Sequence, residues 1–107
     1  MRELDTDTFD DAIAGGPLLV DFWGPWCRPC KALEPILAEL EETVPVAKVN
    51  VDDNPALGAR YEVFSIPLVI LFANGERVSS IVGVRPRSHF DEWLAEVLPA
   101  AQVDVDA

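Results

Sequence analysis

The sequence predicts a single α/β domain in which a central mixed β-sheet is flanked by helices on both faces. Segments with strand patterns alternate with segments of helical periodicity along most of the chain, an order typical of sheets covered by helices. Two apolar runs show almost no polar alternation, as expected of strands buried on both faces. A hairpin pattern near the C-terminal end requires one antiparallel pair, so the sheet must be mixed.

The chain begins with patterns for a short strand, a helix and a buried strand. Residues 2–4 fit a short strand. The segment LDTDTFDDAIAGG predicts a helix, because Thr6 or Asp7 can cap its start and two glycines can end it. Residues 17–23 (PLLVDFW) form a nearly continuous apolar run, which indicates a strand buried on both faces.

A longer amphipathic helix is expected from Cys27 onward. Apolar side chains recur at spacings of three and four, and glutamates fill other positions of the helical wheel. The residues expected to face inward are Leu33, Ile36, Leu37, Leu40 and Val44. Pro35 lies inside this helix and is expected to kink it.

The second half predicts a strand, a helix and a hairpin. Residues 44–52 (VPVAKVNVD) indicate a second buried strand, and residues 54–63 a helix with Asn54 as its cap and Pro55 at its first position. In residues 67–83 two apolar runs flank an Asn-Gly pair, which predicts a hairpin.

A last amphipathic helix is expected at residues 88–98, capped by Ser88. Its inward-facing side chains would be Phe90, Trp93, Leu94, Val97 and Leu98. Residues 99–107 (PAAQVDVDA) predict a flexible tail.

Length and charge restrict the possible functions. The chain has 107 residues, of which 50% are hydrophobic, which suits one packed domain over residues 1–107. Its net charge of −11 would repel DNA and RNA. The acidic N-terminal segment lacks the apolar stretch of a signal peptide, and no run approaches the ~18 apolar residues of a membrane span. We therefore expect a cytoplasmic protein without membrane association, where two cysteines are more often catalytic or metal-binding than a permanent crosslink.

Both cysteines lie in residues 22–31 (FWGPWCRPCK), and three roles compete for them. As a structural crosslink, Cys27 and Cys30 would close a tiny loop worth roughly 2 kcal/mol, against about 5 kcal/mol for a 100-residue loop. As zinc ligands they would need two further donors, whereas the single histidine, His89, is distant in sequence. We expect no metal, although a metal bridging two chains stays open as an alternative.

A redox role fits the position of the pair best. Cys27 follows a buried strand and begins a helix, where unpaired backbone N–H groups and the positive end of the helix dipole favour a thiolate. The pKa of the Cys27 thiol should therefore fall, which supplies the attacking species at neutral pH. Cys30 lies one helical turn later and can attack the mixed disulfide to release the product.

Residues 20–31 (VDFWGPWCRPCK) closely resemble the thioredoxin family, whose signature is W-C-G-P-C-K after a strand carrying V-D-F-W. Similar segments recur at the expected separations in residues 47–55 (AKVNVDDNP), 65–76 (SIPLVILFANGE) and 81–83 (IVG), so that the resemblance covers about residues 2–98. It implies the thioredoxin fold and a protein-disulfide reductase with a redox-active disulfide and no bound cofactor. It also implies electron transport from NADPH through a thioredoxin reductase to disulfide-containing client proteins, and a role in redox homeostasis. We expect a monomer.

The resemblance also implies catalytic roles for four residues. Cys27 would be the nucleophile and Cys30 the resolving thiol. Asp21 would assist proton transfer at the second sulfur, and Lys48 would interact with Asp21. The residues alone agree for Asp21, because a carboxyl group inside LLVDFW should be desolvated and have its pKa raised towards neutrality.

A substrate-binding surface is implied as well, around an exposed sulfur. Its residues would be Trp26, Arg28, Pro29, Ile66, Pro67, Gly83 and Val84. Pro67 would follow a cis peptide bond, and an extended client segment could pair with backbone groups at this surface. Trp23 is expected to support the site from below.

The sequence departs from the family pattern at three positions, with Arg28 for glycine, Ser65 for glycine and Leu68 for threonine. Arg28 near Cys27 should favour the thiolate, and so the reduced form, by about 1 kcal/mol, which corresponds to roughly 20 mV of reduction potential. In the competing interpretation Arg28 points into water and selects acidic partners. Leu68 makes the substrate surface more apolar.

Two alternative functions stay open from the sequence. One is oxidation or isomerisation of client disulfides, which a high reduction potential would favour. The other is a non-redox binding module, against which the presence of both cysteines and Asp21 argues.

Overall fold

A computed structural model describes residues 1–101 of the chain. The elements follow in the order β1 (Arg2–Leu4), α1 (Phe9–Ile13), β2 (Leu18–Trp23), α2 (Arg28–Leu40), β3 (Val46–Asn50), α3 (Pro55–Arg60), β4 (Leu68–Ala73), β5 (Glu76–Val82) and α4 (Arg87–Ala101). Each strand and helix expected from the sequence is present, including the short first strand.

The strands form one mixed sheet in the order β1-β3-β2-β4-β5. β3 runs parallel to both β1 and β2, whereas β4 runs antiparallel to β2 and β5 antiparallel to β4. The mixed sheet predicted from the alternating pattern is therefore confirmed. β2, which leads into the cysteine pair, is the central strand and is buried along almost its whole length.

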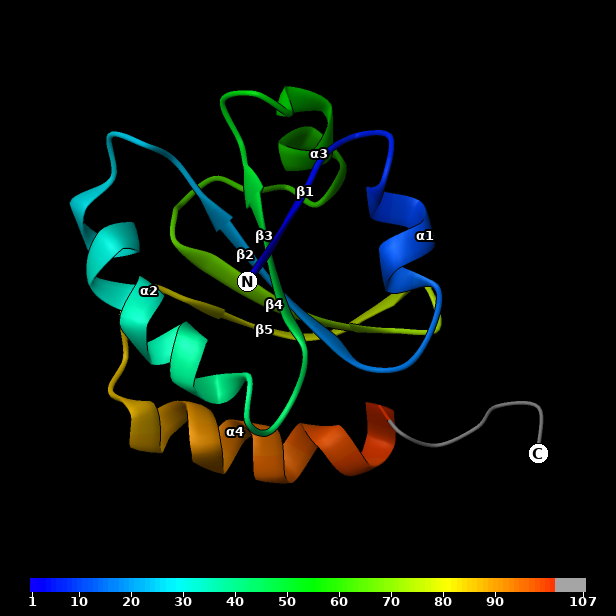
Figure 1. Cartoon of the computed structure of the whole chain (residues 1–107), viewed down its shortest axis with the longest axis vertical. Helices are drawn as coiled ribbons and strands as arrows, with labels where there is room; N and C mark the ends of the chain where they lie inside the picture. The colour runs from blue at the N-terminus through cyan, green and yellow to red at the C-terminus, as the bar shows by residue number, and fades with distance from the viewer. Residues whose placement is uncertain (102–107) are drawn as a thin grey trace.

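Helices cover both faces of the sheet, as predicted (Figure 1). The core under α2 and α4 contains Leu19, Leu33, Leu37, Phe90 and Leu94. The core under α1 and α3 contains Phe9, Ile13, Val20, Phe22 and Leu57. Because side chains alternate along a strand, Asp21 lies on the same face as Leu19, beneath α2 and α4.

The long helix α2 buries most of the side chains expected of it, although Ile36 is only partly buried, and it is shorter than expected. Leu33, Leu37 and Leu40 are buried, and Pro35 lies inside the helix. The helix ends at Leu40, so Val44 lies beyond it, although Val44 is still buried in the same core.

The predicted cap of α1 was wrong. The helix begins at Phe9, and neither Thr6 nor Asp7 precedes it directly. Instead, the carboxylate of Asp5 accepts hydrogen bonds from the backbone N–H groups of Asp7 and Thr8, each at 2.9 Å. These bonds form a turn immediately ahead of the helix.

The predicted cap of α3 is in place but acts differently. Asn54 immediately precedes Pro55, yet its side chain makes no capping hydrogen bond. Its Oδ1 atom accepts a bond from the backbone N–H of Thr6 at 3.1 Å. Asn54 therefore ties the loop after β1 to the start of α3.

The hairpin between β4 and β5 turns at Asn74 and Gly75, as predicted. Both residues have positive φ angles, 55° and 81°, which is the conformation that a tight two-residue hairpin turn requires and that Asn-Gly pairs favour.

The last helix is longer than the sequence suggested. It begins at Arg87, so Ser88 lies within it and is not its cap, and it continues to Ala101. The tail prediction was therefore wrong for residues 99–101, because Ala101 is buried in the core beneath α4. The remainder of the predicted tail, residues 102–107, lies outside the described residues. Within residues 1–101, no helix has both the length and the apolar character needed to cross a membrane.

Candidate active site

Cys27 and Cys30 lie where β2 leads into α2. Cys27 is the N-cap residue of α2 in an extended conformation, and Cys30 is in the first turn. The two are joined by a disulfide, with their Cα atoms 5.3 Å apart. The backbone N–H of Cys30 donates a hydrogen bond to Cys27 Sγ at 3.2 Å. The sulfur of Cys27 therefore occupies the place that a capping oxygen usually takes at the start of a helix.

The local sequence explains this geometry. Pro29 lies in the first turn of α2, where its missing N–H is not needed and its fixed φ suits the helix. A thiolate at Cys27 would face the amide of Cys30 and the positive end of a helix that is 13 residues long. Both interactions stabilise negative charge on this sulfur.

The cysteines are less accessible than the sequence suggested. Cys27 is 4% exposed and Cys30 3%, so the prediction of an openly exposed sulfur was wrong. Trp26, which precedes the pair, is 67% exposed. The aromatic residue beside the pair is therefore far more accessible than the two sulfurs.

Asp21 is a buried carboxyl group on the face of β2 that α2 covers. It is 2% exposed, and its Oδ1 atom has no hydrogen-bond partner among the described residues. Burial raises the pKa of Asp21 from 3.8 to about 7; Lys48 lowers it, and Glu34 and Glu3 raise it further. The predicted rise in this pKa is confirmed.

Cys30 is directed towards the same face as Asp21. Cys30, Leu33 and Leu37 are all buried on α2, at spacings that place them on one side of a helix. The leucines contribute to the core beneath α2, on the face of the sheet that carries Asp21. The sulfur of Cys30 and the buried carboxyl group therefore share one layer of the protein.

Lys48 is the neighbour of Asp21 in the sheet, but it does not form an ion pair with it. The two residues are register partners on β3 and β2. The Nζ atom of Lys48 instead lies 3.5 Å from Glu34 Oε1 and 4.8 Å from the centre of the Trp23 ring. Within residues 1–101, Glu34 is the only carboxylate paired with Lys48. Lys48 therefore acts on Asp21 through its charge, which lowers the pKa of Asp21, and not through a direct contact.

Several residues of the predicted substrate surface lie close together. A Cβ atom on Gly24 would lie 3.1 Å from Trp26 Cε2 and 3.2 Å from Ile66 Cδ1, so both side chains lie against Gly24, and both line one cavity. The peptide bond between Ile66 and Pro67 is cis, as the resemblance implied. The backbone N–H of Gly83 donates to the carbonyl of Pro67 at 2.8 Å, and Val84, which follows, is partly exposed.

Arg28 and Pro29 are exposed at the start of α2. Arg28 forms no ion pair within the described part of the chain. Its charge is therefore not neutralised by a neighbouring carboxylate, although it lies next to Cys27 in sequence.

The sequence interpretation missed three residues around the site. Glu34 lies four residues after Cys30, a spacing that does signal proximity on a helix. Asp52 accepts a hydrogen bond from Trp26 Nε1–H at 2.8 Å, and no sequence signal marked it. Phe64 is 90% exposed and, with Trp26 and Ile66, lines a cavity of about 380 Å³.

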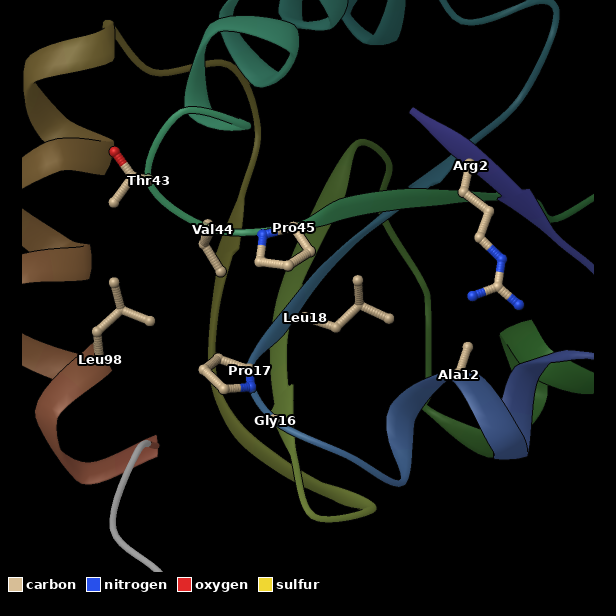
Figure 2. Close-up of a pocket in the computed structure, with 9 residues that line it drawn as sticks. All are labelled: Arg2, Ala12, Gly16, Pro17, Leu18, Thr43, Val44, Pro45 and Leu98. Carbon is tan, nitrogen blue, oxygen red and sulfur yellow. The ribbon is translucent and has the colours of Figure 1, made fainter.

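A larger hollow of about 500 Å³ lies elsewhere in the protein, beside the start of β2 (Figure 2). Leu18, Pro45 and Leu98 line it, together with residues of α1 and β1. Leu18 begins β2, whereas Cys27 follows its end, so this hollow is separate from the redox pair. No group of three histidine, cysteine or acidic residues suited to a metal ion occurs in residues 1–101.

Comparison with known proteins supports one family. The family model described as thioredoxin matches residues 1–96. A thioredoxin of Staphylococcus epidermidis is 46% identical over 102 residues, which cover 92% of this chain and 93% of that protein. A thioredoxin of Staphylococcus aureus is 46% identical over 94 residues, covering 84% of this chain and 86% of that protein. The family match includes both cysteines and every strand of the sheet.

Proposed function

The chain belongs to the thioredoxin family and is a thiol–disulfide oxidoreductase that reduces protein disulfides, and from this premise we propose how its residues divide the reaction. The observation that carries the assignment is the Cys27–Cys30 disulfide at the start of α2. A dithiol at this position gains a stabilised thiolate on one sulfur and has the second sulfur one turn away, which are the two requirements for exchange.

The reaction proceeds in two exchanges. The Cys27 thiolate attacks a client disulfide, forming a mixed disulfide and releasing one client sulfur as a thiolate. Cys30 then loses its proton and attacks Cys27 Sγ, which breaks the mixed disulfide and releases the second client sulfur. The client gains two electrons and becomes a dithiol, and the protein is left with the Cys27–Cys30 disulfide.

Asp21 is the residue that we assign to the proton of Cys30. Its carboxyl group is buried on the sheet face beneath α2 and has a pKa of about 7. A base works best when its pKa lies near the working pH, which supports this role. Lys48 would modulate Asp21 through its charge, and Trp23, whose ring lies under the ammonium of Lys48, would support the site.

An apolar surface beside Cys27 would hold the client. Its residues in this proposal are Trp26, Pro29, Ile66, Pro67, Gly83 and Val84, and the position of Trp26 and Ile66 around one cavity supports it. An extended client segment can place its disulfide next to Cys27 by pairing with backbone groups there. Arg28 would add a positive charge at the edge.

The dithiol would be regenerated outside this chain. We propose that a thioredoxin reductase returns the two electrons, drawing them from NADPH, so that the chain itself binds no cofactor. We propose further that the protein works as a monomer in the cytoplasm on several client proteins.

Arg28 is the one feature that points to an oxidising function, but its effect on the reduction potential is too small to favour that function. The charge of Arg28 should raise the reduction potential by roughly 20 mV, whereas the typical reducing and isomerising members of this class differ by about 90 mV. Arg28 alone therefore does not move the protein out of the reducing range.

The direct test is reduction of insulin disulfides with NADPH and a thioredoxin reductase, using the wild type, Cys27→Ser and Cys30→Ser. We expect turnover in the wild type and none in either variant, with Cys30→Ser trapped as a mixed disulfide. Normal turnover in either variant would refute the assigned roles. A Cys27→Ser protein that kept its full biological activity would instead favour a non-redox binding function.

A further inference from the structure

Three carboxylates surround one lysine beneath α2. On the sheet, Lys48 has Asp21 of β2 as its register partner on one side and Glu3 of β1 on the other. Register partners on neighbouring parallel strands point to the same face of a sheet. Glu34 reaches the same lysine from α2, with Oε1 3.5 Å from Lys48 Nζ. A single ammonium group is therefore available to several acidic side chains.

Lys48 forms its ion pair with an exposed carboxylate of α2. The side chain of Glu34 is 52% exposed and that of Lys48 22%, so the pair forms at the rim of the protein. The ring of Trp23 lies 4.8 Å from the ammonium and favours this position. Asp21, which is far more buried, keeps an Oδ1 atom without a hydrogen-bond partner.

We propose that Glu34 is a positioning residue: it holds the ammonium of Lys48 at the rim and so leaves Asp21 without a counter-ion. Glu34 acts through Lys48 and does not itself exchange a proton with substrate. The positioning of Lys48 by Glu34 does not depend on what Asp21 does in the reaction. Its effect on catalysis rests on the proposed function, in which Asp21 accepts the proton of Cys30.

The flexibility of lysine makes the arrangement adjustable. Its four-carbon stem allows the ammonium to move between acceptors. Without the charge of Glu34, the ammonium would approach Asp21, since that carboxylate lies on the adjacent strand. An opposite charge at such close range stabilises the carboxylate and lowers its pKa. Asp21 would then be a weaker base for a thiol at neutral pH.

The charged groups that face Asp21 come from three neighbouring elements. They are Lys48 on β3, Glu34 on α2 and Glu3 on β1, while its register partner on β4 is the apolar Val69. Glu3 is the weaker competitor, because it makes no ion pair within residues 1–101, whereas Glu34 does. This difference directs the test to Glu34.

The test is the pKa of the Asp21 carboxyl group, followed by NMR in the oxidised protein, where no turnover occurs. We expect Glu34→Gln to lower it by about one pH unit, through the loss of one negative charge and the approach of Lys48. The matched control is Glu39→Gln, which removes the same charge from α2 and breaks an exposed ion pair with Arg87. This control should leave the pKa of Asp21 unchanged.

The route through Lys48 is tested by repeating the substitution in a Lys48→Met background. There the effect of Glu34→Gln should fall to less than half, because the movable charge is absent. An unchanged pKa in Glu34→Gln would overturn the proposal, and so would an undiminished effect in the Lys48→Met background.

A second readout separates this inference from the role of Asp21. In client reduction, the pH at which activity rises should move lower in Glu34→Gln together with the pKa of Asp21. If NMR shows the lower pKa and the activity profile stays in place, the positioning role of Glu34 stands and the assignment of Asp21 as the proton acceptor fails.

Discussion

Asp21 and Lys48 are register partners on adjacent strands, yet the ammonium of Lys48 pairs with Glu34 and an oxygen of Asp21 stays buried without a hydrogen-bond partner. A buried carboxylate in this state is costly, and the cost is relieved by protonation. The protein therefore maintains a carboxyl group that gains and loses its proton near neutral pH.

The stability of the protein should fall as the pH rises from about 4 to 7. Folding raises the pKa of Asp21 to about 7 from 3.8, so in this range the folded state holds a proton that the unfolded state has released. The stability that this proton contributes is present below pH 4 and is lost as the pH rises, at about 1.4 kcal/mol per pH unit. Between pH 5 and pH 8 the loss is roughly 3 kcal/mol.

Urea denaturation at both pH values measures this difference. In Asp21→Asn, residue 21 cannot ionise. The fall in the free energy of unfolding between pH 5 and pH 8 should therefore be smaller than in the wild type by roughly 3 kcal/mol. An identical pH dependence in the wild type and in Asp21→Asn would contradict the raised pKa.

Asp21→Asn should slow the release of the client more than the initial attack. The first exchange needs only the Cys27 thiolate, whereas the second needs a proton to leave Cys30. We expect the second step to slow by about tenfold or more at pH 7, so that the mixed disulfide between Cys27 and the client accumulates. Single-turnover experiments with acid quenching measure both steps. Equal slowing of the two steps would show that the substitution acts on the site in general.

Arg28→Gly should make the protein a stronger reductant. Arg28 is exposed and unpaired within the described part of the chain, and its charge favours the reduced form with its thiolate. Equilibration with glutathione should give a reduction potential for Arg28→Gly that is roughly 20 mV lower than that of the wild type. The difference should shrink in 1 M salt, where the screening length is only about 3 Å.

The control for Arg28 is Arg60→Gly, which removes a cation that is not next to the cysteines. Arg60 pairs with Asp10, and the two charged groups are 2.7 Å apart. Its potential should match that of the wild type. A wild-type potential equal to or below that of Arg28→Gly would end this interpretation.

Asp52→Ala should weaken the binding of protein clients. The side chain of Trp26 is 67% exposed, and its indole N–H is held by Asp52 at 2.8 Å. Loss of this bond frees the ring at the edge of the client surface, at a cost of about 1 kcal/mol, or roughly a fivefold rise in KM for a protein disulfide. A small disulfide that does not span the surface should be reduced at the wild-type rate. If both substrates are affected equally, Asp52 does not act through client binding.

Most of the fold could be predicted because the sheet is built from strongly patterned segments. The apolar run of β2 is typical of a buried strand, and the Asn74–Gly75 pair is typical of a tight hairpin turn. The helix ends were less predictable, since Asp5 and Asn54 use their side chains for turns and tertiary contacts that do not follow from sequence spacing. The helix α4 extends to Ala101 because that residue packs into the core, which no local pattern reveals.

The site was predictable where its residues are close in sequence. The segment from Asp21 to Cys30 contains the strand, the turn and the helix start that place both sulfurs. The choice of Lys48 between Asp21 and Glu34 was not predictable, because it is decided by side-chain competition between three elements. Asp52 comes from the loop after β3 and carries no motif.

The most direct test of the central claim is the ionisation of Cys27 in the reduced protein, followed by thiolate absorbance in Cys30→Ser so that one thiol titrates. We predict that Cys27 ionises well below the value of about 8.5 for free cysteine, because the amide of Cys30 and the start of α2 face its sulfur. A midpoint at or above that of free cysteine would contradict the account.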